Sequence, residues 1–276
     1  MTDEQGLTPD QLDALCGPKT TKHASTPLDM PFVMIATPCK DGRVDINYTM
    51  SLCASCQVLS AAGIKYVTVC ACSSSVDNAR NALATTFMKS ECTHLLFIDD
   101  DMCWASDLPL RLLNENVDIV GAPCRKKQFR VEFNVRHTDH VGYIGGRPWM
   151  LQIDGIGMGV TLIHRKVFEA LSGSVPKYYM FNEDKEPTYM FFRHQLIEDG
   201  GRTKYESEDF NFCRLAREKG MEIFGYADEL VPHIGRVAFS ARYSDRLHRH
   251  ALHGFTSKRE RYEPNVVGTE EHEVRA

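Results

Sequence analysis

The chain has 276 residues, of which 43% are hydrophobic and 25% are charged, and its formal net charge is -5 at pH 7. These proportions are typical of a globular protein, and they exclude a collagen, a coiled coil and a wholly disordered chain. The small negative net charge creates no overall attraction to nucleic acid or to anionic membranes. The length allows one large α/β domain or two small ones, and either arrangement can bury a sizeable core.

Hydropathy and cysteine content bear on where the protein works. No apolar run approaches the roughly 18 residues that span a bilayer, and the acidic, polar first ten residues do not resemble a secretory signal. The ten cysteines lie in apolar segments, so we expect buried, reduced cysteines in a cytoplasmic protein. The pairs Cys53/Cys56 and Cys70/Cys72 have spacings that zinc sites use, but their apolar neighbours favour burial over a structural zinc site.

Residues 1–30 are predicted to form an extension outside the main domain. A proline at the second position of a capping box, at residues 8–11, predicts a short helix that ends near Gly17. Residues 18–30 read as a polar linker.

From residue 31 onward, segments with strand and helix patterns alternate. The expected strands cover residues 32–36, 66–72, 94–98 and 118–122, and the expected helices cover residues 46–62, 77–89 and 107–115. Four such alternations are typical of βαβ units, which predicts a parallel sheet with helices on both faces. Ligands of such sheets bind beyond the carboxyl ends of the strands. Thr37, Pro38, residues 73–75 and the aspartates at 99–101 follow strands and therefore belong at that edge.

The second half of the chain has a more antiparallel pattern. Strands are expected at residues 129–137, 149–153, 159–164 and 222–226, helices at residues 165–171 and 208–219, and a hairpin or a mobile loop within the polar stretch 172–205. We therefore expect one domain at residues 31–240, followed by a basic tail or lid at residues 241–276.

Three consecutive aspartates, Asp99, Asp100 and Asp101, directly follow an apolar strand. Their carboxylates repel one another, and a hard cation such as Mg²⁺ or Mn²⁺ supplies the opposite charge through oxygen ligands. Asp99 and Asp101 are two residues apart on an extended backbone, so their side chains can point the same way and share one ion. The alternative is a solvated acidic turn that caps the next helix.

Five motifs together resemble the GT-A glycosyltransferases. They are the DxD-like triplet at residues 99–101, the helix start at 76–81, the glycine-rich segment at 153–165, the ED-like segment at 206–213 and the late histidine at 231–235. The resemblance extends in the family's order over about residues 31–240. It implies a single Rossmann-like α/β domain with a mostly parallel sheet, helices on both faces and a smaller antiparallel acceptor-side part. It also implies an enzyme, a hexosyl- or pentosyltransferase that uses a nucleotide-sugar donor.

The resemblance assigns roles to individual residues. Asp99, Asp101 and His233 would bind Mn²⁺ or Mg²⁺, although His233 has the alternatives of a contact to the pyrophosphate and of a purely structural role. The residues assigned to the donor are Thr37, Pro38, Asp77, Arg80, Asp99 and Asp100. Arg80 has the alternative of pairing with Asp77 or with the acidic triplet.

Glu208 and Asp209 begin an expected helix and match the ED motif. A carboxylate near the acceptor hydroxyl can remove its proton as a general base, and inverting members of the family use the Asp of this motif. Asp209 is therefore our predicted base, with Glu208 beside it, while the stereochemical outcome stays open. Carboxylates at a helix start are also favourable for the helix dipole alone.

Two basic clusters suggest how an anionic group could be bound. Arg125, Lys126 and Lys127 follow the fourth strand, and residues 236–261 contain seven Lys or Arg against two acidic residues. They suit a solvated surface, a lid over the donor diphosphate, or a polyanionic acceptor such as DNA with hydroxymethylated pyrimidines. The absence of an expected membrane anchor and the short chain would fit a virus-encoded enzyme in the host cytoplasm.

Two other functions compete with glycosyl transfer. A sugar-phosphate nucleotidyltransferase shares much of this architecture, but its glycine- and arginine-rich phosphate loop is not found, because the first strand ends in Thr37-Pro38-Cys39-Lys40. A non-catalytic protein that binds nucleotide sugars is the second alternative.

Overall fold

The computed structural model describes residues 30–137, 143–144, 146–179, 186–235 and 237–252. Residues 1–29 of the predicted extension, with its short helix, and the end of the tail at residues 253–276 lie outside the described residues. Among the described residues, no helix is both long enough and apolar enough to cross a membrane.

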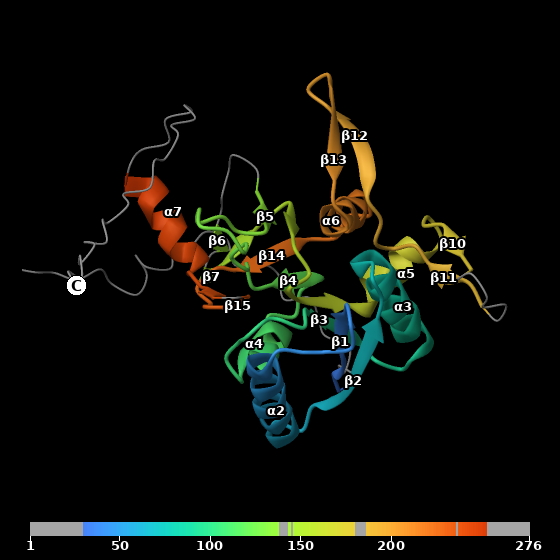
Figure 1. Ribbon diagram of the computed structural model, residues 1–276, viewed down its shortest axis with the longest axis horizontal. Helices are drawn as coiled ribbons and strands as arrows, with labels where there is room; N and C mark the ends of the chain where they lie inside the picture. Colours follow the sequence, from blue (N-terminus) through green and yellow to red (C-terminus); the bar gives the residue numbers. More distant parts are fainter. Residues whose placement is uncertain (1–29, 138–142, 145, 180–185, 236, 253–276) are drawn as a thin grey trace, which may run out of the picture.

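An eight-stranded sheet forms the centre of the molecule (Figure 1). Its strands in chain order are β1 (Phe32–Cys39), β2 (Lys65–Cys72), β3 (His94–Ile98), β4 (Ile119–Gly121), β6 (Tyr143–Ile144), β7 (Arg147–Gln152), β9 (Val160–His164) and β14 (Ile223–Tyr226). Their spatial order is β2-β1-β3-β9-β4-β14-β7-β6. Strands β1, β2, β3, β4 and β14 run in one direction, whereas β7 and β9 run against them. The predicted α/β class with a mostly parallel sheet is confirmed.

Helices cover both faces of the sheet, as predicted. One face carries α2 (Ile46–Ala61) and α4 (Leu108–Asn114), and the other carries α3 (Val76–Lys89), α5 (Arg165–Ser172) and α6 (Glu208–Glu218). The alternation of side chains along β1 divides its residues between these two cores. Val33 and Ile35 pack on the α2 side, whereas Met34 and Ala36 pack on the α3 side. Both cores are therefore built on the same buried strands.

The order of strands departs from a simple series of βαβ units at β9. This strand is antiparallel to both of its neighbours and lies between β3 and β4, so that Leu162 pairs with Leu96 on one side and Val120 on the other. The prediction of an antiparallel strand at residues 159–164 is confirmed. Its position at the centre of the sheet brings the end of β3 next to the glycine-rich segment that precedes β9.

Small two-stranded sheets make up much of the second half. They are β5 (Val135–Arg136) with β8 (Gly155–Ile156), β10 (Lys177–Tyr178) with β11 (Thr188–Tyr189), β12 (Gln195–Asp199) with β13 (Arg202–Glu206), and β15 (His233–Ile234) with β16 (Ala238–Phe239). A hairpin and a mobile loop were the two alternatives for residues 172–205, and β12 and β13 form a hairpin there, which projects from the body (Figure 1). The expected strand at 129–137 is reduced to β5, because residues 124–134 fold back on themselves through the Asn134 N–H to Cys124 carbonyl bond of 3.0 Å.

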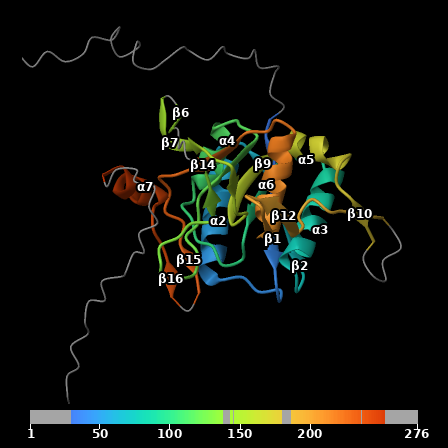
Figure 2. The ribbon, with the colours of Figure 1, turned by 90° about the horizontal axis from the view of Figure 1, so that it is seen from above.

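The beginning of the basic tail is part of the core. Helix α7 (Tyr243–Leu252) lies at the opposite end of the molecule from α3 (Figures 1 and 2). Tyr243 is buried and packs edge-on against Phe133, with ring centroids 5.1 Å apart. The Ser244 hydroxyl donates to Asp228 at 3.1 Å. The predicted boundary at residue 240 therefore falls before a residue that belongs to the packed core.

The expectation of buried cysteines is wrong for Cys53, Cys70 and Cys72, whose side chains are exposed. The reason is that β2 is the edge strand of the sheet, and α2 leaves the outward side chains of β2 and its own outer face to solvent. The nine cysteines among the described residues are all unpaired. Within the same residues, no three His, Cys, Asp or Glu side chains are grouped as a metal site would need, which includes the considered zinc pairs.

A histidine pair makes the stability of the fold dependent on pH. His94 of β3 and His164 of β9 are cross-strand partners with ring centroids 4.8 Å apart. Burial lowers the pKa of both, and the neighbouring His164 lowers the pKa of His94 further, to about 4. His94 binds a proton near pH 6.5 in the unfolded chain but only near pH 4 in the folded protein. Between pH 4 and pH 6.5 the unfolded state therefore binds more protons than the folded state.

We therefore predict that the free energy of unfolding decreases as the pH falls from 6.5 to 4. The substitution His94→Gln should flatten this slope, because it removes the group with the lowered pKa. Urea unfolding at several pH values measures both slopes. Equal slopes for the two proteins would show that His94 is not the source.

Candidate functional site

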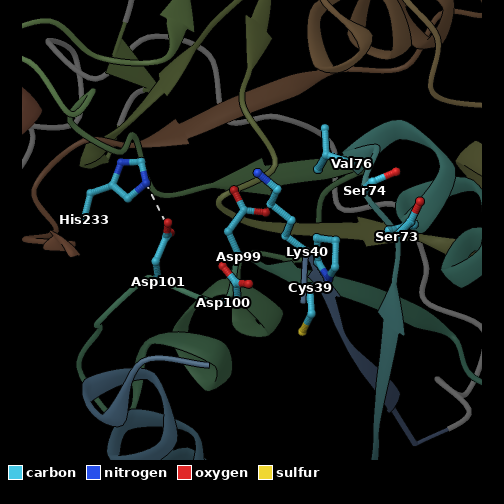
Figure 3. A pocket seen from close by; sticks show the side chains of 11 residues that line it. Cys39, Lys40, Ser73, Ser74, Val76, Asp99, Asp100, Asp101 and His233 are labelled. Carbon is cyan, nitrogen blue, oxygen red and sulfur yellow. Dashed lines mark ion pairs between the residues drawn. The ribbon is translucent and has the colours of Figure 1, made fainter. Parts of the chain in front are cut away.

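A pocket of about 230 Å³ opens beyond the carboxyl ends of β1, β2 and β3 (Figure 3). The residues that line it are Pro38, Cys39, Lys40, Ser73, Ser74, Val76, Ala79, Asp99, Asp100, Asp101 and His233. This is the edge at which parallel sheets bind ligands. The prediction that Pro38, the serine loop and the acidic triplet share this edge is confirmed.

The backbone of the acidic triplet is fixed on two sides. The Asp99 N–H donates to the Gly159 carbonyl at 3.0 Å, which ties the end of β3 to the segment before β9. The Asp100 carbonyl accepts from the N–H of Asp45, the residue that caps α2, at 2.9 Å. Backbone bonds therefore fix the triplet independently of the contacts that its charged side chains make.

Backbone pairing also brings His233 to the triplet from a distant part of the sequence. Met102 and His233 form an antiparallel bridge. The N–H of Ile234 donates to the Asp101 carbonyl at 2.7 Å, and the N–H of Cys103 donates to the Pro232 carbonyl at 2.9 Å. The side chain of His233 consequently faces Asp101 (Figure 3).

The contacts of His233 determine which of its ring nitrogens carries a proton. Nδ1 lies 3.0 Å from the Arg125 carbonyl, which can only accept, so Nδ1 donates. Nε2 faces Oδ1 of Asp101 at 3.2 Å. In a neutral ring Nε2 is then an acceptor that faces an acceptor, and the buried Oδ1 has no hydrogen-bond donor. A proton on the ring or a cation between the two atoms resolves this conflict.

The second carboxylate oxygen of Asp101 is in contact with a cation. The Lys127 ammonium, from the loop after β4, forms an ion pair with Oδ2. Burial alone would raise the pKa of Asp101, but His233 and Lys127 outweigh it and hold the pKa below its usual value. Asp101 is therefore ionised in the folded protein at neutral pH.

Arg80 of α3 joins the acidic triplet to the start of α6. Its guanidinium is almost fully buried and forms ion pairs with Asp99 at 3.0 Å, with Glu208 at 2.7 Å and with Asp209. Of the two pairings considered from the sequence, the one with the triplet is confirmed. Asp77 instead accepts a hydrogen bond from Ser75. The contact between Arg80 and the ED segment was not predicted.

Glu208 and Asp209 are buried and line neither pocket of the site. One oxygen of Asp209 contacts Arg80, and the other accepts from the Met158 N–H at 3.3 Å. Burial raises the pKa of Asp209 to about 7; Arg80 opposes this rise, and Glu208 and Asp99 add to it. Asp209 thus connects Arg80 to the glycine-rich segment behind the pocket.

Other predicted donor residues divide into two groups. Asp100 lines the pocket, and burial together with the charges of Asp101 and Asp99 raises its pKa. Thr37, Asp77 and Arg80 do not line it. Thr37 is buried on the other face of β1, where its hydroxyl contacts the Tyr48 hydroxyl.

A second pocket, of about 260 Å³, adjoins the first and shares Asp99 and His233 with it. Its other lining residues are Met102, Cys124, Arg125, Lys126, Lys127, Asn134, Gly157 and Gly159. The basic cluster that follows the fourth strand, Arg125, Lys126 and Lys127, therefore lies at this edge of the sheet. Gly157 is required here, because a Cβ atom at this position would lie 1.7 Å from Nδ2 of Asn134.

Several lining residues were not given roles from the sequence. Lys40 follows β1, and Figure 3 shows its side chain extending into the pocket towards the aspartates. Ser73 and Ser74 follow β2. The position directly after a parallel strand placed the serines at this edge from the sequence, and the same signal could have found Lys40. Asn134 carries no such signal.

No protein-family model and no curated protein sequence matches this chain. Among solved structures, A197 from STIV is similar at 15% identity, with 78% of this chain and 91% of that chain covered and a TM-score of 0.47. A mutant of Drosophila β-1,4-galactosyltransferase 7, in complex with manganese, UDP-Gal and xylobiose, is similar at 12% identity over 80% and 74% of the two chains, with a TM-score of 0.40. The 4-diphosphocytidyl-2C-methyl-D-erythritol synthase from Anaerococcus prevotii is similar at 12% identity over 56% and 81%, with a TM-score of 0.32.

The buried cluster around Arg80 yields a test of stability. We predict that Arg80→Gln lowers the free energy of unfolding by about 3–5 kcal/mol at pH 7, because it leaves buried carboxylates without their cation. Adding Asp209→Asn should recover part of the loss. Arg217→Gln, which removes a surface pair with Asp154, should cost about 1 kcal/mol or less. Urea unfolding compares the four proteins, and a similar loss for both arginine variants would contradict the role of the cluster.

Proposed function

We propose that the protein is a metal-dependent glycosyltransferase of the GT-A type, which transfers a sugar from a nucleotide-sugar donor to an acceptor hydroxyl. The observation that carries the proposal is the pocket beyond β1, β2 and β3, where Asp99, Asp100, Asp101 and His233 converge. The motif resemblance supports it, because the DxD-like and ED-like segments meet through Arg80.

The residues fit a divalent cation at Asp101 and His233. The buried Oδ1 of Asp101 lacks a donor and faces a ring nitrogen at 3.2 Å. That separation is close to the roughly 3.0 Å between adjacent ligands of an octahedral ion with bonds of about 2.1 Å. The Arg125 carbonyl holds the other ring nitrogen, which is the outer contact that metal-binding histidines usually make.

Two ligands that face one another are not a complete site, and Asp99 is a further carboxylate that lines the same pocket. It is paired with Arg80 in the described state, and no group of three His, Cys, Asp or Glu side chains is assembled among the described residues. We propose that Asp99 completes the site with Asp101 and His233 when the ion binds, and that the three hold Mn²⁺ or Mg²⁺, with Mn²⁺ favoured by the imidazole. When bound, the ion would act as a Lewis acid on the departing diphosphate.

The other residues of the pocket suit the donor. The Lys40 ammonium and the hydroxyls of Ser73 and Ser74 line the same cavity as the triplet and can bind phosphate oxygens. Asp100 and Pro38 are proposed donor contacts, as the sequence predicted. Thr37 and Asp77 would support the donor site from behind.

Asp209 is our proposed general base, with Glu208 beside it. Its raised pKa, about 7, is suited to accepting a proton at neutral pH. Its buried oxygens contact Arg80 and Met158, so in this role it must release one of them when the acceptor binds.

The proposed acceptor side is the second pocket, with its cations Arg125, Lys126 and Lys127. DNA with hydroxymethylated pyrimidines is a proposed acceptor, and the positive charge of this pocket is the observation that supports it. We place the protein in the cytoplasm, or in the host cytoplasm for a virus-encoded enzyme, because the exposed thiols of Cys53, Cys70 and Cys72 suit a reducing compartment.

A panel of nucleotide sugars with Mn²⁺ tests the proposal. Release of nucleoside diphosphate from one donor supports glycosyl transfer or hydrolysis. Release of pyrophosphate from a sugar phosphate and a nucleoside triphosphate would support the nucleotidyltransferase alternative. Binding of a nucleotide sugar without turnover, with every acceptor in the panel, would support the non-catalytic alternative.

The first expected outcome concerns the metal. Asp101→Asn should abolish turnover and weaken Mn²⁺-dependent nucleotide binding, because it removes one negative ligand. The melting temperature should stay within a few degrees, since the backbone bonds of residue 101 are kept. Asp199→Asn, on the exposed β12–β13 hairpin, is the matched control and should keep full activity. Full activity of Asp101→Asn would contradict the metal role.

The second expected outcome concerns the base. Asp209→Asn should lower kcat by about 10²–10⁴-fold and change donor affinity much less, because a general base acts in the chemical step. Steady-state kinetics and donor titration separate the two quantities. An equal loss of donor affinity would assign Asp209 to positioning Arg80 and Asp99 instead.

A further inference from the structure

The loop after β4 places a lysine on the proposed metal ligand. Lys127 lines the second pocket, yet its ammonium reaches Oδ2 of Asp101, which lines the first. Its aliphatic chain passes Gly235, where an added Cβ would lie 3.6 Å from Cδ of Lys127. The side chain therefore crosses the boundary between the two pockets.

This ion pair is accessible to solvent. The side chains of Lys127 and Asp101 are 34% and 31% exposed, respectively. By contrast, the guanidinium pairs of Arg80 with Glu208 and Asp209 are almost fully buried. An exposed lysine pair contributes little to stability and exchanges readily, so Lys127 can leave Asp101 without unfolding the site.

We infer that Lys127 is a mobile internal cation that occupies Asp101 until a diphosphate enters, and that it thereby makes divalent metal binding depend on the diphosphate. The inference rests on the proposed function, because it concerns the same donor site. Without a diphosphate, a divalent ion at Asp101 must compete with the ammonium already on that carboxylate. When a diphosphate enters the first pocket, its oxygens offer the ammonium another partner, and Asp101 becomes free for the metal.

The same segment controls both groups that face the metal. The Arg125 carbonyl orients His233, and Lys127 two residues later occupies Asp101. A movement of Lys127 alone leaves His233 oriented. The inference therefore predicts opposite effects of removing the Lys127 charge on two ligands: tighter binding of a divalent cation and weaker binding of a diphosphate.

The experiment uses the full chain and two probes, each without the other. Mn²⁺ alone is followed by the paramagnetic resonance signal of the free ion, and inorganic pyrophosphate without metal is followed by calorimetry. We expect Lys127→Gln to bind Mn²⁺ about tenfold more tightly than the unsubstituted protein and pyrophosphate several-fold more weakly. Lys127→Arg, which keeps the charge, should resemble the unsubstituted protein.

The control is Arg130→Gln, which removes an equal charge from the same loop. Arg130 pairs with Glu132 rather than with Asp101. It should leave both affinities unchanged, and Asp101→Asn should cancel the gain in Mn²⁺ affinity of Lys127→Gln. The inference is overturned if Lys127→Gln does not tighten Mn²⁺ binding, if both affinities move in the same direction, or if Arg130→Gln gives the same gain.

These outcomes are distinct from those of the donor panel. Turnover of a nucleotide sugar together with unchanged Mn²⁺ affinity in Lys127→Gln would leave the proposed function intact and remove the role of Lys127. If the two affinities shift in opposite directions but the protein turns over no donor, the role of Lys127 is supported and the proposed enzymatic activity is contradicted.

Discussion

A single buried guanidinium connects the parts of the site that come from distant segments of the chain. Arg80 contacts Asp99 at the end of β3 and both Glu208 and Asp209 at the start of α6. Three carboxylates around one buried cation leave an excess of negative charge in a region of low dielectric, which is why burial and Glu208 raise the pKa of Asp209. The position of α6 relative to the sheet, and of the glycine-rich segment bonded to Asp209, depends on this cluster.

Two cations, Arg80 and Lys127, balance the negative charge of the acidic triplet, and they differ in burial and in flexibility. Arg80 is buried and planar and binds several carboxylates at once, so it is a permanent part of the fold. Lys127 is a half-exposed point charge on a flexible stem. A site with one fixed and one exchangeable cation keeps its shape when a charged ligand enters, because only the second needs to move.

The sequence predicted the elements well where hydrophobic period and strand ends determine them. Residues 94–101 illustrate this, because the apolar run at residues 95–98, followed by three aspartates, indicates a buried parallel strand with its carboxyl end at a binding site. Thr37 and Pro38 are neighbours in β1 and point to opposite faces of the sheet, so Thr37 lies on the α2 side while Pro38 lines the pocket. The contacts of Arg80 with Glu208 and of Lys127 with Asp101 could not be predicted, because they depend on the tertiary packing of α6 and of the loop after β4. Cys70 is exposed because β2 is the edge strand of the sheet. The order of the strands is a tertiary property that the residues around Cys70 do not indicate.

The central place of β9 has a consequence for how the chain is made. β3 and β4 emerge from the ribosome before β9; β3 then lacks a neighbour on one side, and β4 lacks a neighbour on both sides, because β9 and β14 follow it in the chain. During that interval the unpaired edges of β3 and β4 are open to pairing with other chains, and unpaired strand edges make such intermediates prone to aggregation. The nascent chain therefore cannot complete its sheet from the N-terminus onward, and its yield in a foreign host should depend on chaperones that cover these edges.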